Sequence, residues 1–394
     1  MINFGLFLFL LKTYHIYYSY KALPNNWDAI VQHDIFLQSS YLKALENASP
    51  TNIQLFYVGV FNSDELVGVA IIQRVQLYLK DMFRLTKVSC FKDFFQNSIS
   101  KIIKGNILVV GNLTHTGQHG VFFQADKISQ ADYLNLLFTA LEDLKKQIKQ
   151  KQNKKIRAIL LKDYFEADPI HNEKAFFEKN KLSKVSVQPN MIMAIKPHWV
   201  LNEDYIKDFN KKYRDRYKTA QKKLININVR ELDSDVIKSQ SNRLHELYLN
   251  VSNHAKFNTF LMPENHFYSL KMEFKDYFRV FGYYLNEELI GFYTMILNNE
   301  NLETYFLGYD SEHQYTNKLY LNMLFDMAEF GIENRFKNVV YARTAMEIKS
   351  SVGAKPKPMF MYVKHTNNFL NALLKQLFGL MNPTQKWEER HPFK

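Results

Sequence analysis

Cysteine is nearly absent from this chain. Cys90 is the single cysteine among 394 residues. One cysteine excludes an internal disulfide and any metal cluster held by several thiolates, and it is typical of proteins in a reducing compartment. We therefore expect a cytoplasmic protein.

Apolar runs long enough to cross a membrane are also lacking. The apolar N-terminal run, residues 2–11, has ten residues, whereas a membrane-spanning helix needs about 20. No basic residue precedes this run and no small-residue cleavage site follows it, which argues against a signal peptide. We expect either a first buried strand here or a translation start upstream of the natural one, and no transmembrane span.

The sequence motifs of several large enzyme classes are absent as well. The chain has no Gly-x-Ser-x-Gly elbow, no Walker phosphate loop, no dinucleotide-binding glycine pattern and no His-Glu-x-x-His. Serine hydrolase, NTPase, Rossmann oxidoreductase and zinc metalloprotease activities therefore have no support. His115 and His119 are four residues apart, but they lie in a glycine-bearing loop with no carboxylate before Asp126. We predict that they line a polar cleft between lobes and that the chain has no metal site.

Acidic residues are too few to balance the basic ones. The chain has 39 Asp and Glu against 51 Lys and Arg, a formal net charge of +12. This excess favours anionic partners such as nucleic acid, a membrane surface or a phosphorylated small molecule. Seven cations and no acid fall within residues 145–157, and seven cations with one acid fall within residues 211–223. The simplest interpretation of both runs is the solvated face of a helix; the second run also carries an aromatic stripe that can pack against a core.

What the chain does contain is one glycine pattern that occurs twice. Residues 57–68 (YVGVFNSDELVG) and residues 280–291 (VFGYYLNEELIG) match with a constant offset of 223 residues. Each copy has an apolar run, a polar turn and a second apolar run, which predicts a β-hairpin. A repeat with so long a period is typical of a duplicated domain rather than of a solenoid.

The order of the predicted elements is also approximately the same in the two halves: helix, helix, hairpin, strand, helix, strand. Helices are predicted at residues 27–48 and 132–150 in the first half and at residues 203–224 in the second. We predict an α/β (α+β) fold with a mixed sheet flanked by helices, in two tandem lobes, residues 1–198 and 199–394.

This order resembles the fold of GNAT acyltransferases, and two such lobes in one chain resemble the Fem-type aminoacyltransferases. More closely, the chain is similar to bacterial GNAT-family proteins that are related to Fem and grouped with peptidoglycan biosynthesis or recognition. The resemblance covers nearly the whole chain and rests on four stretches, residues 36–46, 212–220, 282–291 and 343–354. It implies an enzyme, a GNAT-type N-acyltransferase.

The resemblance further implies transfer of an acyl or aminoacyl group from an activated donor to an amine, with the donor bound between parted strands of the sheet. No tightly bound cofactor is expected; acyl-CoA or aminoacyl-tRNA would be a co-substrate. The donor site is expected in the second lobe, and the residues expected to bind the donor or its anionic groups are Arg214, Arg216, Lys218, Asn317, Arg343 and Lys349. The catalytic base is expected among Tyr309, Asp310 and Glu347.

One loop departs from the GNAT pattern. GNAT enzymes cradle the coenzyme A pyrophosphate in a glycine-rich turn ahead of the central helix, but residues 310–318 contain no glycine. Backbone N–H groups at a helix start can bind phosphate without glycine, so an acyl-CoA stays the leading donor.

Two further functions stay open. A Fem-type transferase would use aminoacyl-tRNA in cell-wall precursor synthesis, which the basic charge favours. A non-catalytic module would bind an anionic glycan precursor, which the glycine-free loop favours. The expected partners are therefore a small-molecule amine or a cell-wall precursor, with tRNA in the Fem-type case and no DNA.

Overall fold

The structure is a computed structural model that describes residues 12–77, 105–254, 259–381 and 387–394. Cys90 and the apolar N-terminal run lie outside the described residues. Among the helices that are described, none has both the length and the apolar character needed to cross a bilayer.

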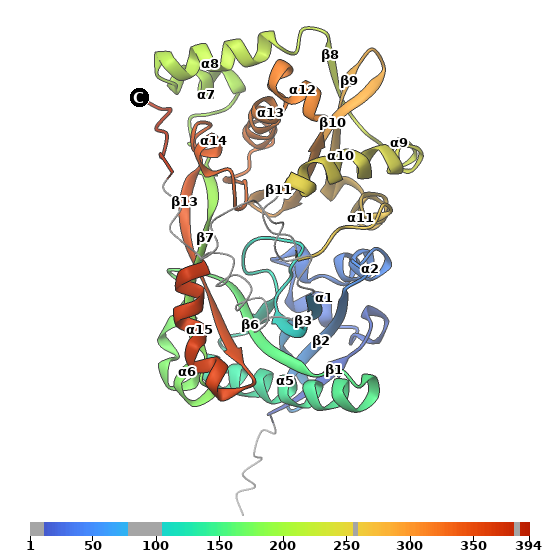
Figure 1. Cartoon of the computed structure of the whole chain (residues 1–394), viewed down its shortest axis with the longest axis vertical. Helices are drawn as coiled ribbons and strands as arrows, with labels where there is room; N and C mark the ends of the chain where they lie inside the picture. Colours follow the sequence, from blue (N-terminus) through green and yellow to red (C-terminus); the bar gives the residue numbers. More distant parts are fainter. Residues whose placement is uncertain (1–11, 78–104, 255–258, 382–386) are drawn as a thin grey trace, which may run out of the picture.

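One continuous mixed sheet runs through the described part of the chain (Figure 1). Its strands, in spatial order, are β1 (Lys12–Tyr17), β2 (Ile53–Asn62), β3 (Glu65–Leu77), β4 (Gly105–Val110), β6 (Ile156–Phe165), β13 (Lys355–His365), β7 (Ser183–Ala194), β12 (Asn338–Val340), β11 (Asn301–Tyr309), β10 (Glu288–Asn298), β9 (Phe278–Leu285) and β8 (Ile227–Glu231). A short strand, β5 (Val121–Phe123), pairs with β3 beside this series. The predicted mixed sheet with flanking helices is confirmed.

The spatial order of the strands reads the same from both edges. β2 and β3 hold the second and third places from one edge, and β9 and β10 hold the same places from the other. Both hairpins also shift register by one residue at the same point, at Val67 in β3 and at Ile290 in β10. The predicted equivalence of the two glycine hairpins is therefore confirmed at the level of single residues.

The glycine after each bulge has the same packing function in both hairpins. A Cβ atom on Gly68 would lie 2.8 Å from the ring of Tyr133, and one on Gly291 would lie 2.9 Å from the end of Met323. Tyr133 and Met323 belong to the long helices α5 (Gln130–Gln152) and α13 (Leu319–Glu333). Glycine thus lets each helix pack closely on its hairpin.

The two halves exchange their last strands. β13, from the end of the chain, lies between β6 and β7 and is antiparallel to both. β7, from the first half, pairs in turn with β12 of the second half. In Figure 1, β7 and β13 run side by side and join the two ends of the molecule. A single sheet therefore contains strands from both sides of the predicted boundary between residues 198 and 199. The division into two lobes at this boundary stays a prediction.

Helices cover both faces of the sheet. α5 packs on one face in the first half, and α13 packs on the corresponding face in the second. The opposite face carries α2 (Ser39–Asn47), α10 (Ser241–His254) and α11 (His266–Phe274), whose apolar side chains form one core shared by both halves. The other helices and 3-10 turns are η1 (Tyr20–Ala22), α1 (Trp27–Ile30), η2 (Ile35–Leu37), η3 (Pro169–Asn172), α6 (Lys174–Asn180), α7 (Asn202–Asp208), α8 (Lys211–Lys222), α9 (Ser234–Ser239), η4 (Lys275–Tyr277), α12 (Ser311–Asn317), α14 (Met346–Ser350) and α15 (Asn368–Met381).

Two predicted helices are interrupted. Residues 27–48 form α1, η2 and α2 rather than one helix, because Asp28 accepts a hydrogen bond from the Ser39 backbone N–H at 2.7 Å and starts a new helix there. Residues 203–224 form α7 and α8, which separate where Phe209 turns into the core and stacks on Phe393. The stripes of apolar residues predicted the helical segments correctly but did not mark these breaks.

Candidate functional site

The sheet parts in the second half, between β11 and β12. β11 and β12 are parallel neighbours only as far as Glu303 and Val340. Beyond this point β11 continues to Tyr309, whereas the chain after β12 turns to β7, where Tyr341 N–H donates to the Met191 carbonyl at 2.8 Å. Parted parallel strands leave a gap at their carboxyl ends, and open α/β sheets bind ligands in such gaps.

A closed loop fills the equivalent place in the first half. Residues 111–120 follow β4, and both ends of the loop bond to Ile71 of β3, from Gly111 N–H at 2.9 Å and to the Gly120 carbonyl at 2.7 Å. A Cβ atom on Gly120 would lie 2.2 Å from the Cα of Gly111. Only glycine permits this backbone contact, so the glycine-rich sequence forms a pinched Ω-loop here.

A bulge in β6 anchors this Ω-loop. Lys162 and Asp163 form the bulge opposite β13, and Asp163 has φ of 61°, a left-handed conformation that is uncommon outside glycine. Lys162 Nζ donates to the His115 carbonyl at 2.7 Å, and Gly117 N–H donates to Asp163 at 3.1 Å. Lys162 also forms an ion pair with Asp163, which is fully buried.

Arg343 completes the charge of this bulge from the second half. Its guanidinium forms an ion pair with Asp163. Three neighbours of Arg343 in the loop after β12, Ala342, Thr344 and Ala345, have positive φ although none is glycine. Backbone strain of this kind tends to occur at functional sites. Here the strained loop places Arg343 next to Asp163 of the first half.

The Ω-loop carries two histidines to two carboxylates. His115 Nε2 lies 3.3 Å from a Glu303 oxygen, and His119 Nδ1 lies 2.8 Å from an Asp34 oxygen. His119 Nε2 faces the other Glu303 oxygen at 3.9 Å. We call Asp34, His115, His119 and Glu303 the central cluster. It joins the first half to β11 at the point where the sheet parts.

Aromatic rings surround the central cluster. Phe36 stacks on His115 with ring centroids 4.0 Å apart. Tyr305, two residues beyond Glu303 on β11, lies 5.9 Å from the same imidazole and hydrogen bonds through its hydroxyl to His266 Nε2 at 3.0 Å. Asp34, His115 and Glu303 are buried, and burial strengthens the charge interactions among them.

Burial and mutual attraction shift the pKa values of the cluster in different directions. Burial raises the pKa of Glu303 to about 7, against the attraction of His119. Burial and repulsion from His119 and Lys162 hold the pKa of His115 well below its usual range. Burial would lower the pKa of His119, but the Asp34 carboxylate outweighs it and raises that pKa. A carboxyl group with a pKa near neutral can accept a proton at physiological pH.

His115, His119 and Glu303 are also the single group of three potential metal ligands found among the described residues. One ligand atom from each of the three residues lies within 4.8 Å of the other two. The 2.8 and 3.3 Å contacts of the two histidines have hydrogen-bond lengths. Each histidine therefore has a carboxylate as its hydrogen-bond partner, and the absence of a metal site stays a prediction.

Comparison with solved structures finds similar folds over most of the chain. FemX is 12% identical, with 89% of this chain and 98% of that chain covered and a TM-score of 0.54. A tandem GNAT protein from the clavulanic acid biosynthesis pathway is 9% identical, with 90% and 99% covered and a TM-score of 0.51. The chain has the tandem GNAT fold. Comparisons with protein-family models and with curated protein sequences find no match.

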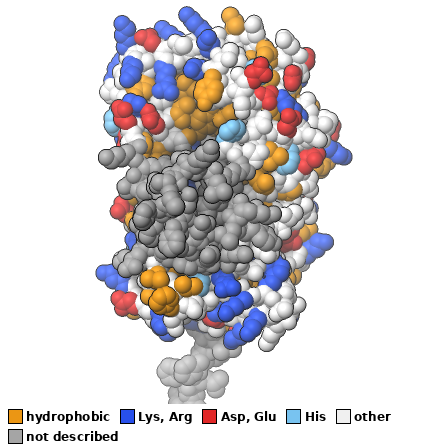
Figure 2. Space-filling model, in the orientation of Figure 1, with side chains coloured by type: hydrophobic (Ala, Val, Ile, Leu, Met, Phe, Trp, Pro, Cys, Tyr) orange, Lys and Arg blue, Asp and Glu red, His pale blue; other side chains and the backbone are white. Residues whose placement is uncertain are grey.

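In this tandem GNAT fold, the cations predicted on α8 form an open surface. Arg216 and Lys218 are exposed and Arg214 is half-buried, and none of the three has an ion-pair partner among the described residues. Figure 2 shows Lys and Arg side chains gathered at the end of the molecule where α8 lies. Asn317, predicted with them, donates to the Lys223 carbonyl at 3.0 Å and so lies at the end of α8.

The other predicted residues of the donor site already have partners within the chain. Arg343 is paired with Asp163, as described above. Lys349 is buried, donates to the Arg343 carbonyl at 2.6 Å and to the Ala342 carbonyl at 3.3 Å, and burial lowers its pKa to about 7. Both side chains therefore hold the strained loop after β12, and binding of the donor by either one stays a prediction.

The three predicted bases lie apart from the central cluster in their contacts. Asp310, at the start of α12, forms an ion pair with Arg243. Glu347 forms an ion pair with Arg390. Tyr309 ends β11, and burial raises its pKa. Asp310 and Glu347 thus have their ion-pair partners outside the central cluster, and a catalytic function for Tyr309, Asp310 or Glu347 stays a prediction.

The sequence analysis missed the two carboxylates of the central cluster. It singled out His115 and His119, which lie against Glu303 of β11, whereas a polar cleft lined by the two histidines stays a prediction. It missed Asp34, Glu303 and the Lys162–Asp163 bulge. The available signal was weak: Glu303 is a lone acid in an apolar strand, and Lys162 and Asp163 interrupt the apolar run from Ile156 to Leu161.

Proposed function

We propose that this protein is an N-acyltransferase that moves an acyl or aminoacyl group from an activated donor, an acyl-CoA, to an amine. The observation that carries the proposal is the buried carboxyl group of Glu303, which is hydrogen bonded to His115 at the point where β11 and β12 part. Burial raises the pKa of this group to about 7. The tandem GNAT fold and its likeness to a tandem GNAT protein support the same reaction class.

The proposed reaction needs a gap for the donor and an acceptor for one proton. The donor would lie between β11 and β12 beyond Val340, where backbone N–H groups no longer paired across the sheet stabilise the oxyanion. The amine nitrogen attacks the carbonyl carbon, a C–N bond forms and the C–S bond to coenzyme A breaks. Glu303, hydrogen bonded to His115, accepts the proton that the amine loses, and the leaving thiolate takes up a proton from water.

Asp34 and His119 would position this base. Asp34 holds the His119 ring from its Nδ1 side and favours a positive charge on this ring. The positive charge on His119 attracts the Glu303 carboxylate. The pair therefore keeps Glu303 partly ionised despite its burial, as a proton acceptor at neutral pH requires.

The test removes the charge of Glu303 and leaves its shape. Mass spectrometry of ligands retained on the purified protein first identifies the donor, and product formation is then measured for Glu303→Gln. We expect the rate to fall by about 10²- to 10⁴-fold with little change in melting temperature. Glu300→Gln is the matched control, because Glu300 is exposed just before β11, where it forms an ion pair with Lys337. A Glu303→Gln rate within twofold of the parent would exclude Glu303 as the base.

The exposed cations of α8 favour a second candidate, a Fem-type transferase that uses aminoacyl-tRNA and a cell-wall precursor. Its support is the unpaired surface of Arg214, Arg216 and Lys218 together with the likeness to FemX. In that case donor affinity falls steeply with salt, and replacing each of these cations by Ala reduces the salt slope by about one. A salt slope that the three replacements leave unchanged would exclude tRNA contact at α8.

A further inference from the structure

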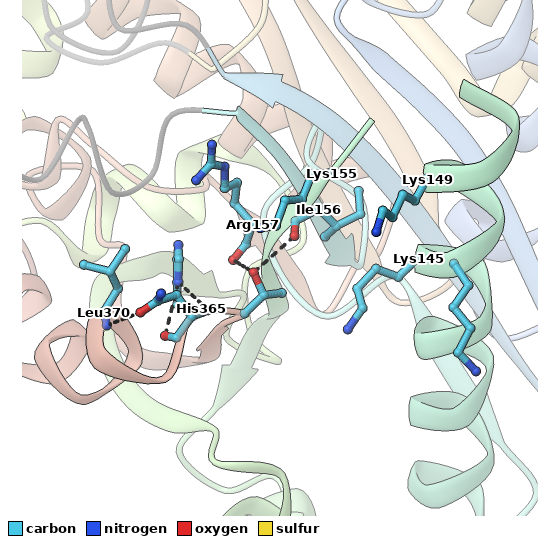
Figure 3. A pocket seen from close by; sticks show the side chains of 10 residues that line it. Lys145, Lys149, Lys155, Ile156, Arg157, His365 and Leu370 are labelled. Carbon is cyan, nitrogen blue, oxygen red and sulfur yellow. Dashed lines mark hydrogen bonds between the residues drawn. The ribbon is translucent and has the colours of Figure 1, made fainter. Parts of the chain in front are cut away.

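Residues 387–394 lie far from the helix that precedes them. α15 starts beside α5 in the first half, where Asn367 and Leu370 line the same cavity as Lys145 and Lys149 (Figure 3). Residues 387–394 lie at the other end of the molecule, beside α7 and α8 (Figure 1). We call residues 387–394 the strap, because their contacts join two separate elements of the second half.

Phe393 anchors the strap in an aromatic pocket. Its ring stacks on Phe209 with centroids 5.4 Å apart and lies 5.1 Å from the ring of Trp199. Both partners are buried. Gly353 forms the floor of the pocket, because a Cβ atom on it would lie 2.5 Å from the Phe393 ring. The fit of the strap therefore depends on a glycine in the loop region that follows β12.

Backbone hydrogen bonds fix the strap on the junction between α7 and α8. Asn210 N–H donates to the Pro392 carbonyl at 2.9 Å, and Lys394 N–H donates to the Asp208 carbonyl at 3.0 Å. The Asn210 side chain donates to the His391 carbonyl at 3.2 Å. Asn210 is also the N-cap of α8. The strap is therefore bonded directly to the start of the helix that carries the exposed cations.

Arg390 joins the strap to α14. Its guanidinium forms an ion pair with Glu347, and its backbone N–H donates to Ser350 Oγ at 2.9 Å. Between these two contacts, Lys349 donates to the Arg343 carbonyl at 2.6 Å. α14 has five residues, and so short a helix has little stability of its own. Contacts such as those of Arg390 must therefore hold α14 and the strained loop before it in place.

The strap thus connects the start of α8 with the loop after β12. This loop leaves the sheet at Val340, where β11 and β12 part. Burial lowers the pKa of Arg216 on α8, and the guanidinium of Arg390 lowers it as well. The charged side chain of the strap therefore stands near the cations of α8 while it is paired with α14.

We propose that the strap positions the loop after β12 for binding of the acyl donor, and that Arg390 is the positioning residue through which it acts. The inference rests on the proposed function, because that function places the donor in the gap beyond Val340. The contacts of Arg390 with Glu347 and Ser350 lie outside the central cluster. Loss of Arg390 should therefore weaken donor binding and leave the proton transfer to Glu303 unchanged.

The test compares two arginine ion pairs of nearly equal exposure. The Arg390 side chain is 26% exposed and pairs with Glu347, and the Arg279 side chain is 27% exposed and pairs with Glu231 at the β8–β9 edge. With acetyl-CoA as donor, we expect the donor KM of Arg390→Ala to rise about fivefold or more, with kcat within about twofold of the parent.

Arg279→Ala is the matched control and should leave the KM and kcat of the parent unchanged. Both alanine variants lose one partly exposed ion pair, so their melting temperatures should stay close to that of the parent. Arg390→Lys should recover most of the lost donor affinity, because lysine can form the same ion pair with Glu347. An unchanged donor KM in Arg390→Ala, or a fall in kcat alone, overturns the proposal.

Hydrogen–deuterium exchange tests the strap without any substrate. Backbone amides of residues 341–354 should exchange about tenfold faster in Arg390→Ala than in the parent, whereas those of the first hairpin, residues 57–68, should keep their rates. Equal exchange at residues 341–354 overturns the proposal. A parent chain that transfers no acyl group would refute the proposed function instead, and the exchange rates would then decide by themselves whether the strap positions this loop.

Discussion

Removing the charge of Asp163 should destabilise the protein more than removing the arginine that pairs with it. Asp163 is fully buried and serves Lys162, Arg343 and the Gly117 N–H. Asp163→Asn keeps the volume but leaves two cations without their counter-charge. Breaking a buried pair by removing one partner costs about 3–5 kcal/mol. Because the Arg343 side chain is 22% exposed and keeps some hydration, we expect the lower end, about 3 kcal/mol.

Arg343→Ala should cost less, about 1.5 kcal/mol, the value of one charge-assisted hydrogen bond. In that variant Asp163 still has Lys162 and the Gly117 N–H, so no buried charge is left alone. The order of the two costs therefore follows from how many partners each side chain serves.

Urea unfolding followed by tryptophan fluorescence measures both values, since Trp27 and Trp199 are buried. Asp64→Asn is the control, because Asp64 lies exposed in the first hairpin turn. Equal costs for Asp163→Asn and Arg343→Ala, or a larger cost for Arg343→Ala, would refute the assignment of Asp163 as the centre of the charge network.

Three further outcomes are expected. Gly120→Ala should lower the free energy of unfolding by about 1–3 kcal/mol in thermal melts, because the added Cβ would lie 2.2 Å from the Gly111 backbone; a neutral effect would mean that the Ω-loop opens freely. Elemental analysis should find far less than one zinc per chain, and stoichiometric zinc that disappears in His119→Ala would instead make the central cluster a metal centre. Burial lowers the pKa of Lys349 to about 7, so above pH 7 the unfolded state binds more protons and stability rises with pH; Lys349→Met should flatten that rise between pH 7 and 9, and an unchanged profile would contradict the shift.

The sequence predicted those parts of the fold that local chemistry determines. Each glycine hairpin carries its own turn residues, and the apolar stripe of α5 identifies a helix without reference to the rest of the chain. The duplication could be predicted from the sequence because both copies of the hairpin have kept this local pattern. The exchange of β7 and β13 could not be predicted, because both sequences read as the final strand of a half and their placement depends on contacts across the whole molecule.

The same distinction explains the site. His115 and His119 could be recognised as candidate site residues because they lie among glycines in a loop, where neither a helix nor a strand accounts for them. Glu303 was not, because a single acid in an apolar strand is ordinary until the fold brings a histidine to 3.3 Å from it. Arg343 was recognised as important, yet its ion pair with Asp163 depends on a residue in the other half.

The exchanged strands also constrain how the chain can fold during its synthesis. β6 pairs with β4 of its own half, but it cannot gain its second neighbour until β13 has been made. Contacts at this edge join residues as far apart as Ile156 and Thr366, 210 positions along the chain. Contacts with such long separations slow folding, and an unpaired strand edge promotes association with other chains in the meantime. The N-terminal half would therefore leave the ribosome with an open slot in its sheet, and only the last strand to be translated would close it.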